Sequence, residues 1–172
     1  MSGFRKFINK IFDGLYKIQT AIAVFSIFIL TVLILLQVFL RYVLKAPLMG
    51  IEELELFPII WMYLCGGAMA SYEKTHIQCG IAEVVTTDKK VLDRVGLVRD
   101  LVTFVISVVI CYWVYGYFAY CQRIWKLSGV LHLPLFLAEG AVFLGLVSMA
   151  LFALRDLVEA MRSMKKVVGG EA

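Results

Sequence analysis

Several charged residues that could do chemistry lie in a short stretch between two long apolar segments, residues 41–53, which we call the corner. Arg41 follows the first segment, and Glu52 and Glu53 begin the second. A charge at the edge of a hydrocarbon layer is costly unless it is paired or functional. Arg41 could therefore form a charge-assisted pair with one of these glutamates across the turn. Alternatively, Arg41 extends toward lipid phosphates and the glutamates favour the start of a helix. The residues alone leave both interpretations open.

Glu139 is a carboxylate within an apolar segment over residues 134–154. A charge at the centre of a bilayer costs about 2.5–3.5 kcal/mol or more, so a carboxylate in a membrane helix is a functional hypothesis. Proton coupling, as in small multidrug exporters, would use such a residue. Its shallow depth instead favours contact with water or with a basic group of a partner. Both roles remain open at this point.

The two histidines raise the question of a haem, which would need two axial ligands at one depth in a helical bundle. His76 ends the second apolar segment and His132 precedes the fourth, so we expect them on opposite sides of the membrane. The four cysteines show neither CxxC spacing nor a nearby histidine, and we expect them to pack as small apolar residues. No basic patch interleaved with aromatic residues suggests nucleic acid. We therefore predict no cofactor and no nucleic acid for this chain.

The composition is that of a membrane protein, because 62% of the 172 residues are hydrophobic and 17% are charged. Four apolar segments are each long enough to cross a hydrocarbon core of about 30 Å. They cover residues 18–40, 54–72, 101–121 and 134–154. We predict an all-α integral membrane protein in which residues 1–172 form a single membrane domain with four transmembrane helices.

Residues 1–17 have an amphipathic helical pattern, with basic residues on the polar face. Such a helix favours the headgroup plane of a membrane, so we predict an interfacial helix ahead of the first span. A signal peptide fits less well because the apolar run that follows is too long. The predicted membrane anchors on its apolar face are Phe4, Phe7, Ile8, Ile11 and Phe12.

The distribution of basic residues predicts the orientation of the chain. Most of the 17 lysines and arginines fall in the N-terminal segment, in the amphipathic connection over residues 73–100 and in the tail over residues 155–172. By the positive-inside rule these parts, and both termini, are cytoplasmic, and the corner faces outward. Within the connection we expect a helix that starts at Lys89 and runs unbroken into the third span.

Small residues on two spans predict close helix packing. Gly66 and Gly67 begin such a face on the second span, and Ala141 with Gly145 form one on the fourth. The spans carry almost no polar lining that could form a pore or an ion cage. This chain is therefore not expected to transport a substrate by itself.

Several of these features together resemble one family, the small membrane subunit (Q subunit, DctQ-like) of tripartite ATP-independent periplasmic (TRAP) transporters. The matching elements are Arg41-Tyr42-Val43, the Pro47 turn, Glu52-Glu53-Leu54, Trp61, Gly66-Gly67-Ala68 and His76-Ile77. The resemblance covers about residues 40–77, and the four-helix hydropathy agrees over the whole chain. One departure is Met49-Gly50-Ile51, where many members place a tryptophan ahead of the acidic pair.

The resemblance implies a role as a non-catalytic scaffold in the bacterial inner membrane, and not as an enzyme. A large membrane subunit (M subunit) would bind organic anions and Na⁺ and move as an elevator against this scaffold. A periplasmic substrate-binding protein would deliver the substrate. The residues assigned to a subunit interface or hairpin clamp are Arg41, Tyr42, Glu52, Glu53, Trp61, Gly66, Gly67, His76 and Glu139.

Two other functions remain open from the residues. A self-sufficient small proton-coupled exporter would use Glu139, and a membrane anchor of a redox complex would carry a haem or bind a quinone.

Overall fold

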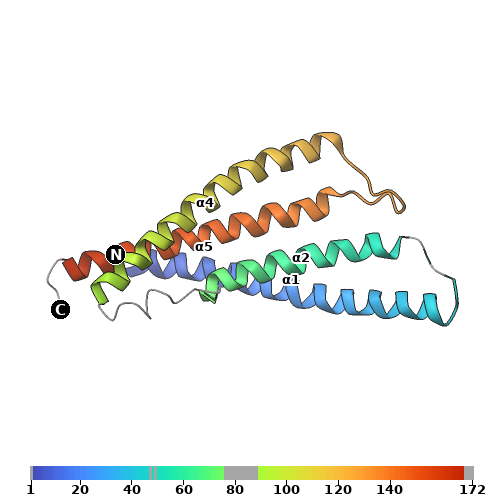
Figure 1. Ribbon diagram of the computed structural model, residues 1–172, viewed down its shortest axis with the longest axis horizontal. Coiled ribbons are helices and arrows are strands. Elements are labelled where there is room, and N and C mark those ends of the chain that lie inside the picture. Colours follow the sequence, from blue (N-terminus) through green and yellow to red (C-terminus); the bar gives the residue numbers. More distant parts are fainter. Residues whose placement is uncertain (1, 47, 49, 76–88, 169–172) are drawn as a thin grey trace.

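The computed structural model describes residues 2–46, 48, 50–75 and 89–168, and their side chains except those of residues 2–9, 89, 90, 163 and 165–168. The described residues form four helices, α1 (Ser2–Tyr42), α2 (Ile51–Glu73), α4 (Lys89–Ile124) and α5 (Phe136–Val168) (Figure 1). Each is long and apolar enough to cross a membrane. The all-α class with four membrane-length helices is confirmed.

Three of the helices are longer than a membrane span requires. α1, α4 and α5 contain 41, 36 and 33 residues. At 1.5 Å per residue they measure about 62, 54 and 50 Å, against a hydrocarbon core of about 30 Å. They must therefore tilt or extend beyond the hydrocarbon layer.

The predicted interfacial helix and the first span form one continuous helix, α1. Residues 2–42 contain no proline, and a glycine such as Gly14 costs a helix only about 1 kcal/mol. Phe12 lies 5.7 Å from Phe152 of α5, ring centre to ring centre, so at this position α1 contacts the other helices. Ile11 is exposed, and the side chains of Phe4, Phe7 and Ile8 lie outside the described part. The headgroup-plane position of residues 1–17 stays a prediction.

The prediction of a helix from Lys89 into the third span is confirmed by α4. α5 likewise continues past the predicted end of the fourth span, and much of the predicted tail is helical. At its other end α5 begins two residues after Pro134. Proline has no backbone N–H, so it cannot donate the hydrogen bond that a position inside a helix requires.

The helices pack in a row, with α1 against α2, α2 against α5 and α5 against α4. In Figure 1 the helices run lengthwise side by side, and α4 diverges from α5 toward the end that carries residues 125–135. We call this end, which also carries the corner, the loop end. The opposite end, where α1 starts and α5 finishes, is the termini end.

α2 and α5 approach closely through small residues. A Cβ atom at Gly145 of α5 would lie 2.8 Å from the Cβ of Leu64 in α2, and one at Gly67 would clash with the flexible Met149 side chain. Ala68 and Ala141 are almost completely buried. The two predicted small-residue faces therefore include residues that lie in the α2–α5 contact.

Candidate functional site: polar clusters at both ends of the helix row

At the loop end, the Glu53 carboxylate binds the connection between α4 and α5. It accepts a hydrogen bond from the Ser128 hydroxyl. It also accepts hydrogen bonds from the backbone N–H groups of Val130 and Leu131, and in both of these the nitrogen lies 3.0 Å from the nearer carboxylate oxygen. Ser128 is buried. Hydrogen bonds to an ionised acceptor are stronger than neutral ones. We call this set of contacts the Glu53 clamp, and it joins the start of α2 to the connection that leads from α4 into α5.

The connection that Glu53 binds is folded as a small hairpin. The Ser128 N–H donates to the Leu133 carbonyl at 2.8 Å, and the Leu135 N–H donates to the Lys126 carbonyl at 3.1 Å. These two bonds fix the backbone on either side of the tip. The tip then presents two successive N–H groups to the carboxylate, an arrangement that suits an anion.

Gly50 allows α2 to start directly beside this hairpin. Its φ is +116°, a backbone conformation that residues with a side chain rarely adopt. A Cβ atom at this position would also lie 3.1 Å from Cγ of Leu131. Both the backbone conformation and the lack of space therefore favour glycine at this position.

Arg41 and Glu52 lie outside the Glu53 clamp. The Arg41 guanidinium carbon is 5.9 Å from the ring centre of Tyr42, and within the described ranges it forms no ion pair with Glu52 or Glu53. Among the described residues the Glu52 carboxylate accepts one hydrogen bond, a long one of 3.4 Å from Gln37. Of the two interpretations left open for Arg41, the ion pair across the corner is not formed. Tyr42 is 70% exposed.

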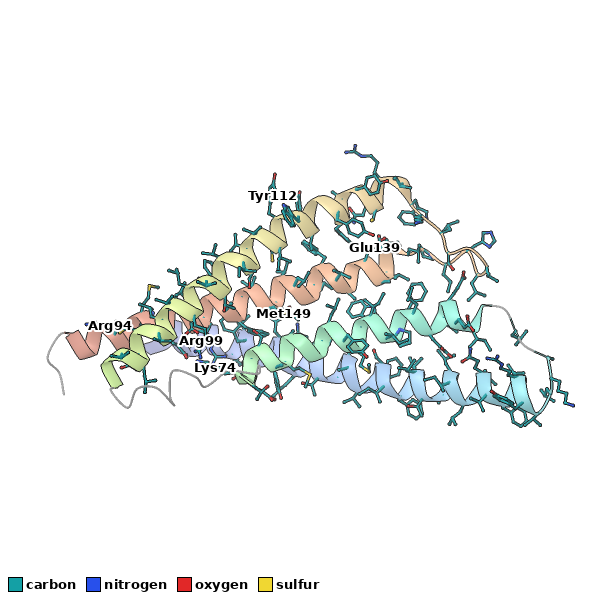
Figure 2. The ribbon with its side chains drawn as sticks, in the orientation of Figure 1. Lys74, Arg94, Arg99, Tyr112, Glu139 and Met149 are labelled. Atoms are coloured by element: carbon teal, nitrogen blue, oxygen red, sulfur yellow. The ribbon has the colours of Figure 1, made fainter. Side chains whose placement is uncertain are left out.

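Glu139 lies in the first turn of α5, near the loop end (Figure 2). The Tyr117 hydroxyl of α4 donates a hydrogen bond of 3.3 Å to its carboxylate. A negative charge is favourable at a helix N-terminus. Glu139 therefore joins α4 to α5 near the loop end, toward which the two helices diverge.

Trp61 contributes to an apolar groove of about 490 Å³ between α1 and α2. Pro58 lies inside α2 and also lines this groove. Gly66 is exposed, with nothing within 4 Å of a Cβ atom added there. The remaining residues of the groove are Ile22, Phe25, Ser26, Ile29, Leu33, Leu54 and Phe57.

At the termini end, two tyrosines join α1 to α2. The rings of Tyr16 and Tyr72 are stacked with centres 4.6 Å apart. The Tyr16 hydroxyl donates to Glu73 of α2, and the Tyr72 hydroxyl donates to Asp13 of α1. Each helix therefore supplies one donor and one acceptor to the other.

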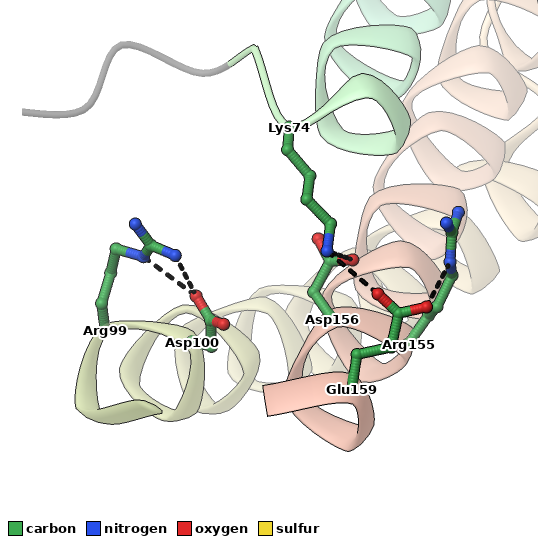
Figure 3. Close-up of polar contacts among 6 residues, drawn as sticks. All are labelled: Lys74, Arg99, Asp100, Arg155, Asp156 and Glu159. Atoms are coloured by element: carbon green, nitrogen blue, oxygen red, sulfur yellow. Dashed lines mark hydrogen bonds and ion pairs between the residues drawn. The ribbon is translucent and has the colours of Figure 1, made fainter. Parts of the chain in front are cut away.

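Lys74 joins the end of α2 to α5 (Figure 3). Its ammonium nitrogen lies 3.1 Å from carboxylate oxygens of both Asp156 and Glu159. Burial alone would lower the pKa of Lys74, but its hydrogen bonds to Glu159 and Asp156 and their charges outweigh burial and raise that pKa. Arg155 lies 3.7 Å from Glu159 and stacks over the Tyr72 ring. We call this set of contacts the Lys74 clamp.

The sequence predictions did not include the Lys74 clamp or its tyrosine neighbours. The available signal was the placement of opposite charges at span ends predicted to share one side of the membrane, such as Lys74 and Asp156. His76, which was predicted to end the second span, lies outside the described residues. In the part of the chain that the structure describes, no three His, Cys, Asp or Glu side chains come together as a group that could hold a metal ion.

Four long apolar helices with polar clusters at both ends define a multi-pass helical membrane protein. A family model described as "Tripartite ATP-independent periplasmic transporters, DctQ component" matches residues 30–163, and the chain belongs to this family. No curated protein matches it. The resemblance found in the corner and second span is thereby confirmed, and the chain is a component of a TRAP transporter.

Proposed function

We propose that this chain is a non-catalytic scaffold subunit of a Na⁺-driven importer of organic anions. The observation that carries the proposal is that α2 is joined to the α4–α5 hairpin at both ends, by the Glu53 clamp at the loop end and by the Lys74 clamp at the termini end. A scaffold must keep its shape while a neighbouring subunit moves. Two polar clamps with close helix packing between them meet that requirement.

The polar residues that were candidates for a transport role contact other groups of this chain. Glu53 binds the hairpin, Glu139 accepts a hydrogen bond from Tyr117, and Lys74 binds two carboxylates. These contacts favour a structural use of the charges. In this proposal the chain holds no cofactor, and the large membrane subunit (M subunit) binds both the substrate and Na⁺.

The partners follow from the family, since a tripartite periplasmic transporter requires further components. We propose that the chain binds the large membrane subunit, which is supplied by a periplasmic substrate-binding protein and moves as an elevator. The location would be the bacterial inner membrane. Basic residues such as Lys10 and Arg162 at the termini end support a cytoplasmic position for that end.

Reconstitution with the large subunit tests the proposal. We expect proteoliposomes containing both membrane subunits, with the binding protein and an inward Na⁺ gradient, to accumulate an organic anion. Omission of this chain should lower uptake at least tenfold, and this chain alone should transport nothing. Transport by this chain alone that Glu139→Gln abolishes would contradict the proposal and support a proton-coupled exporter.

A further inference from the structure

The face of α4 that points away from α5 is rich in aromatic residues in its loop-end half. In Figure 2 the Tyr112 side chain projects from α4 on the side opposite α5. Tyr112 and Tyr120 are 76% and 60% exposed, whereas Tyr115 lies on the other side of Tyr112, with its ring centre 6.5 Å from that of Phe143 in α5. No residue of the segment 91–120 is buried, so one whole side of this helix is open in the isolated chain. We call Tyr112, Gly116 and Tyr120 the α4 aromatic face.

The depth of Tyr112 sets it apart from an ordinary interfacial tyrosine. The uncharged part of α4 lies between Asp100 and Arg123. Tyr112 is about 18 Å along the helix from Asp100 and about 16 Å from Arg123. Because half of the hydrocarbon core is about 15 Å, Tyr112 lies close to the midplane of a bilayer.

Tyr120 provides the contrast on the same face. It lies less than one helical turn from Arg123, about 5 Å along the axis, which is the depth of the aromatic belts of membrane proteins. There water and lipid headgroups can bond its hydroxyl. An aromatic belt therefore accounts for Tyr120 but leaves Tyr112 unexplained.

A tyrosine hydroxyl at the midplane needs a protein acceptor. Hydrocarbon chains cannot accept a hydrogen bond, and an unsatisfied polar group in that environment is costly. In the described part of the chain no group bonds the Tyr112 hydroxyl. Since lipid cannot supply this acceptor, a membrane-embedded protein partner must do so.

The shape of the face suits a helix of such a partner. Gly116 lies one turn from both Tyr112 and Tyr120 on the same side of α4, and a Cβ atom added to it would meet nothing within 4 Å. A small residue between larger ones lets the backbone of a second membrane helix approach closely. Tyrosine side chains on either side would contact that helix and donate to its polar groups.

The exposed surface of α1 differs in chemistry. Its large exposed side chains between residues 24 and 39 are aliphatic residues or phenylalanines, such as Phe28, Val32 and Leu35. The exposed Thr31 hydroxyl donates to the Ile27 carbonyl within the helix. This face needs no external hydrogen-bond partner and suits lipid.

We propose that the α4 aromatic face is a docking surface for the large membrane subunit of the transporter. One helix of that subunit lies against Gly116 and supplies an acceptor, a backbone carbonyl or a polar side chain, to the Tyr112 hydroxyl. The identity of the partner rests on the proposed function. The position of the surface rests on the depth of Tyr112 in the membrane and on the need of its hydroxyl for a hydrogen-bond acceptor.

Co-purification with the large subunit tests this surface. Tyr112→Phe removes only the hydroxyl and should weaken the complex about threefold to tenfold, the value of one hydrogen bond. Tyr120→Phe removes the same atom at headgroup depth and should change little. Gly116→Trp should abolish co-purification, whereas Val32→Trp on α1 should not. Melting of each variant alone in detergent reports whether the chain still folds.

Photo-cross-linking provides a second, independent measurement. A photoreactive phenylalanine at Ala119 should cross-link to the large subunit in the intact complex, and the same group at Phe28 of α1 should not. Cross-links only between two copies of this chain, or none to any protein, would overturn the docking surface. If the unmodified chain binds the large subunit but the α4 variants match their controls, this inference alone fails. If the unmodified chain does not bind it, the proposed function fails as well.

Discussion

Glu53 at the start of α2 accepts a 3.0 Å hydrogen bond from the backbone N–H of Leu131, 78 residues further along the chain. This contact brings the corner against the α4–α5 hairpin, although α1 and α2 form one hairpin of the fold and α4 and α5 the other. A single carboxylate therefore links the two helical hairpins at the loop end.

Removal of the Glu53 carboxylate should loosen the loop end. Glu53→Ala leaves the Val130 and Leu131 N–H groups without their acceptor, and we expect the melting temperature of the purified chain to fall by about 2–6 °C. Glu52→Ala is the matched control, because within the described residues the Glu52 carboxylate makes just the long contact with Gln37. Equal effects of the two substitutions would argue against the Glu53 clamp.

Lys74→Met should weaken the termini end. It removes the ion pairs with Asp156 and Glu159, which are partly exposed, so we expect a loss of about 0.5–1 kcal/mol. A double-mutant cycle with Asp156→Asn isolates the coupling energy, and Lys45→Met in the corner is the control. A coupling energy near zero would show that the contact between Lys74 and Asp156 does not stabilise the fold.

The same clamp should withstand alkaline pH. The pKa of Lys74 is raised above its ordinary value of 10.5 in the folded chain. The stability it contributes is therefore fully present below pH 10.5 and is lost as the pH rises through the raised value. Melting curves of the chain and of Lys74→Met should differ by a constant amount from pH 7 to pH 9. A difference that vanishes within this range would contradict the assignment.

Gly145→Ala should push α2 and α5 apart. The added Cβ atom would lie 2.8 Å from the Cβ of Leu64. That atom is bonded directly to the backbone of α2, so it can move away only if the helix itself moves. We expect a destabilisation of about 1–3 kcal/mol. Gly66→Ala introduces the same atom into open space and should leave the melting temperature of the isolated chain unchanged or slightly raised. The reverse order of the two effects would exclude close α2–α5 packing at Gly145.

The spans and the small-residue packing could be predicted because they depend on local sequence. Long uncharged segments specify membrane helices whatever their neighbours are, and glycines such as Gly145 mark close approach. That α1 is one continuous helix was harder to predict from the sequence. Charges such as Lys10 and Asp13 suggest a change of environment, but they do not end a helix.

The partners of the charged residues could not be predicted in the same way. Closeness in the sequence suggested Arg41 as the partner of Glu53. The Glu53 carboxylate is instead bound by backbone N–H groups whose direction depends on the hairpin around Ser128. The pairing of Tyr72 with Asp13 likewise depends on how α1 and α2 are aligned. Such contacts appear only when the relative position of two helices is known.

The central claim is that this chain stays fixed while the transporter works. Spin labels placed at Leu56 of α2 and Leu137 of α5, both exposed, report the distance between the two hairpins at the loop end. In the complex with the large subunit, double electron–electron resonance should give one narrow distance distribution that is the same with and without Na⁺ and substrate. A second distance whose population changes with Na⁺ or substrate would contradict the scaffold function.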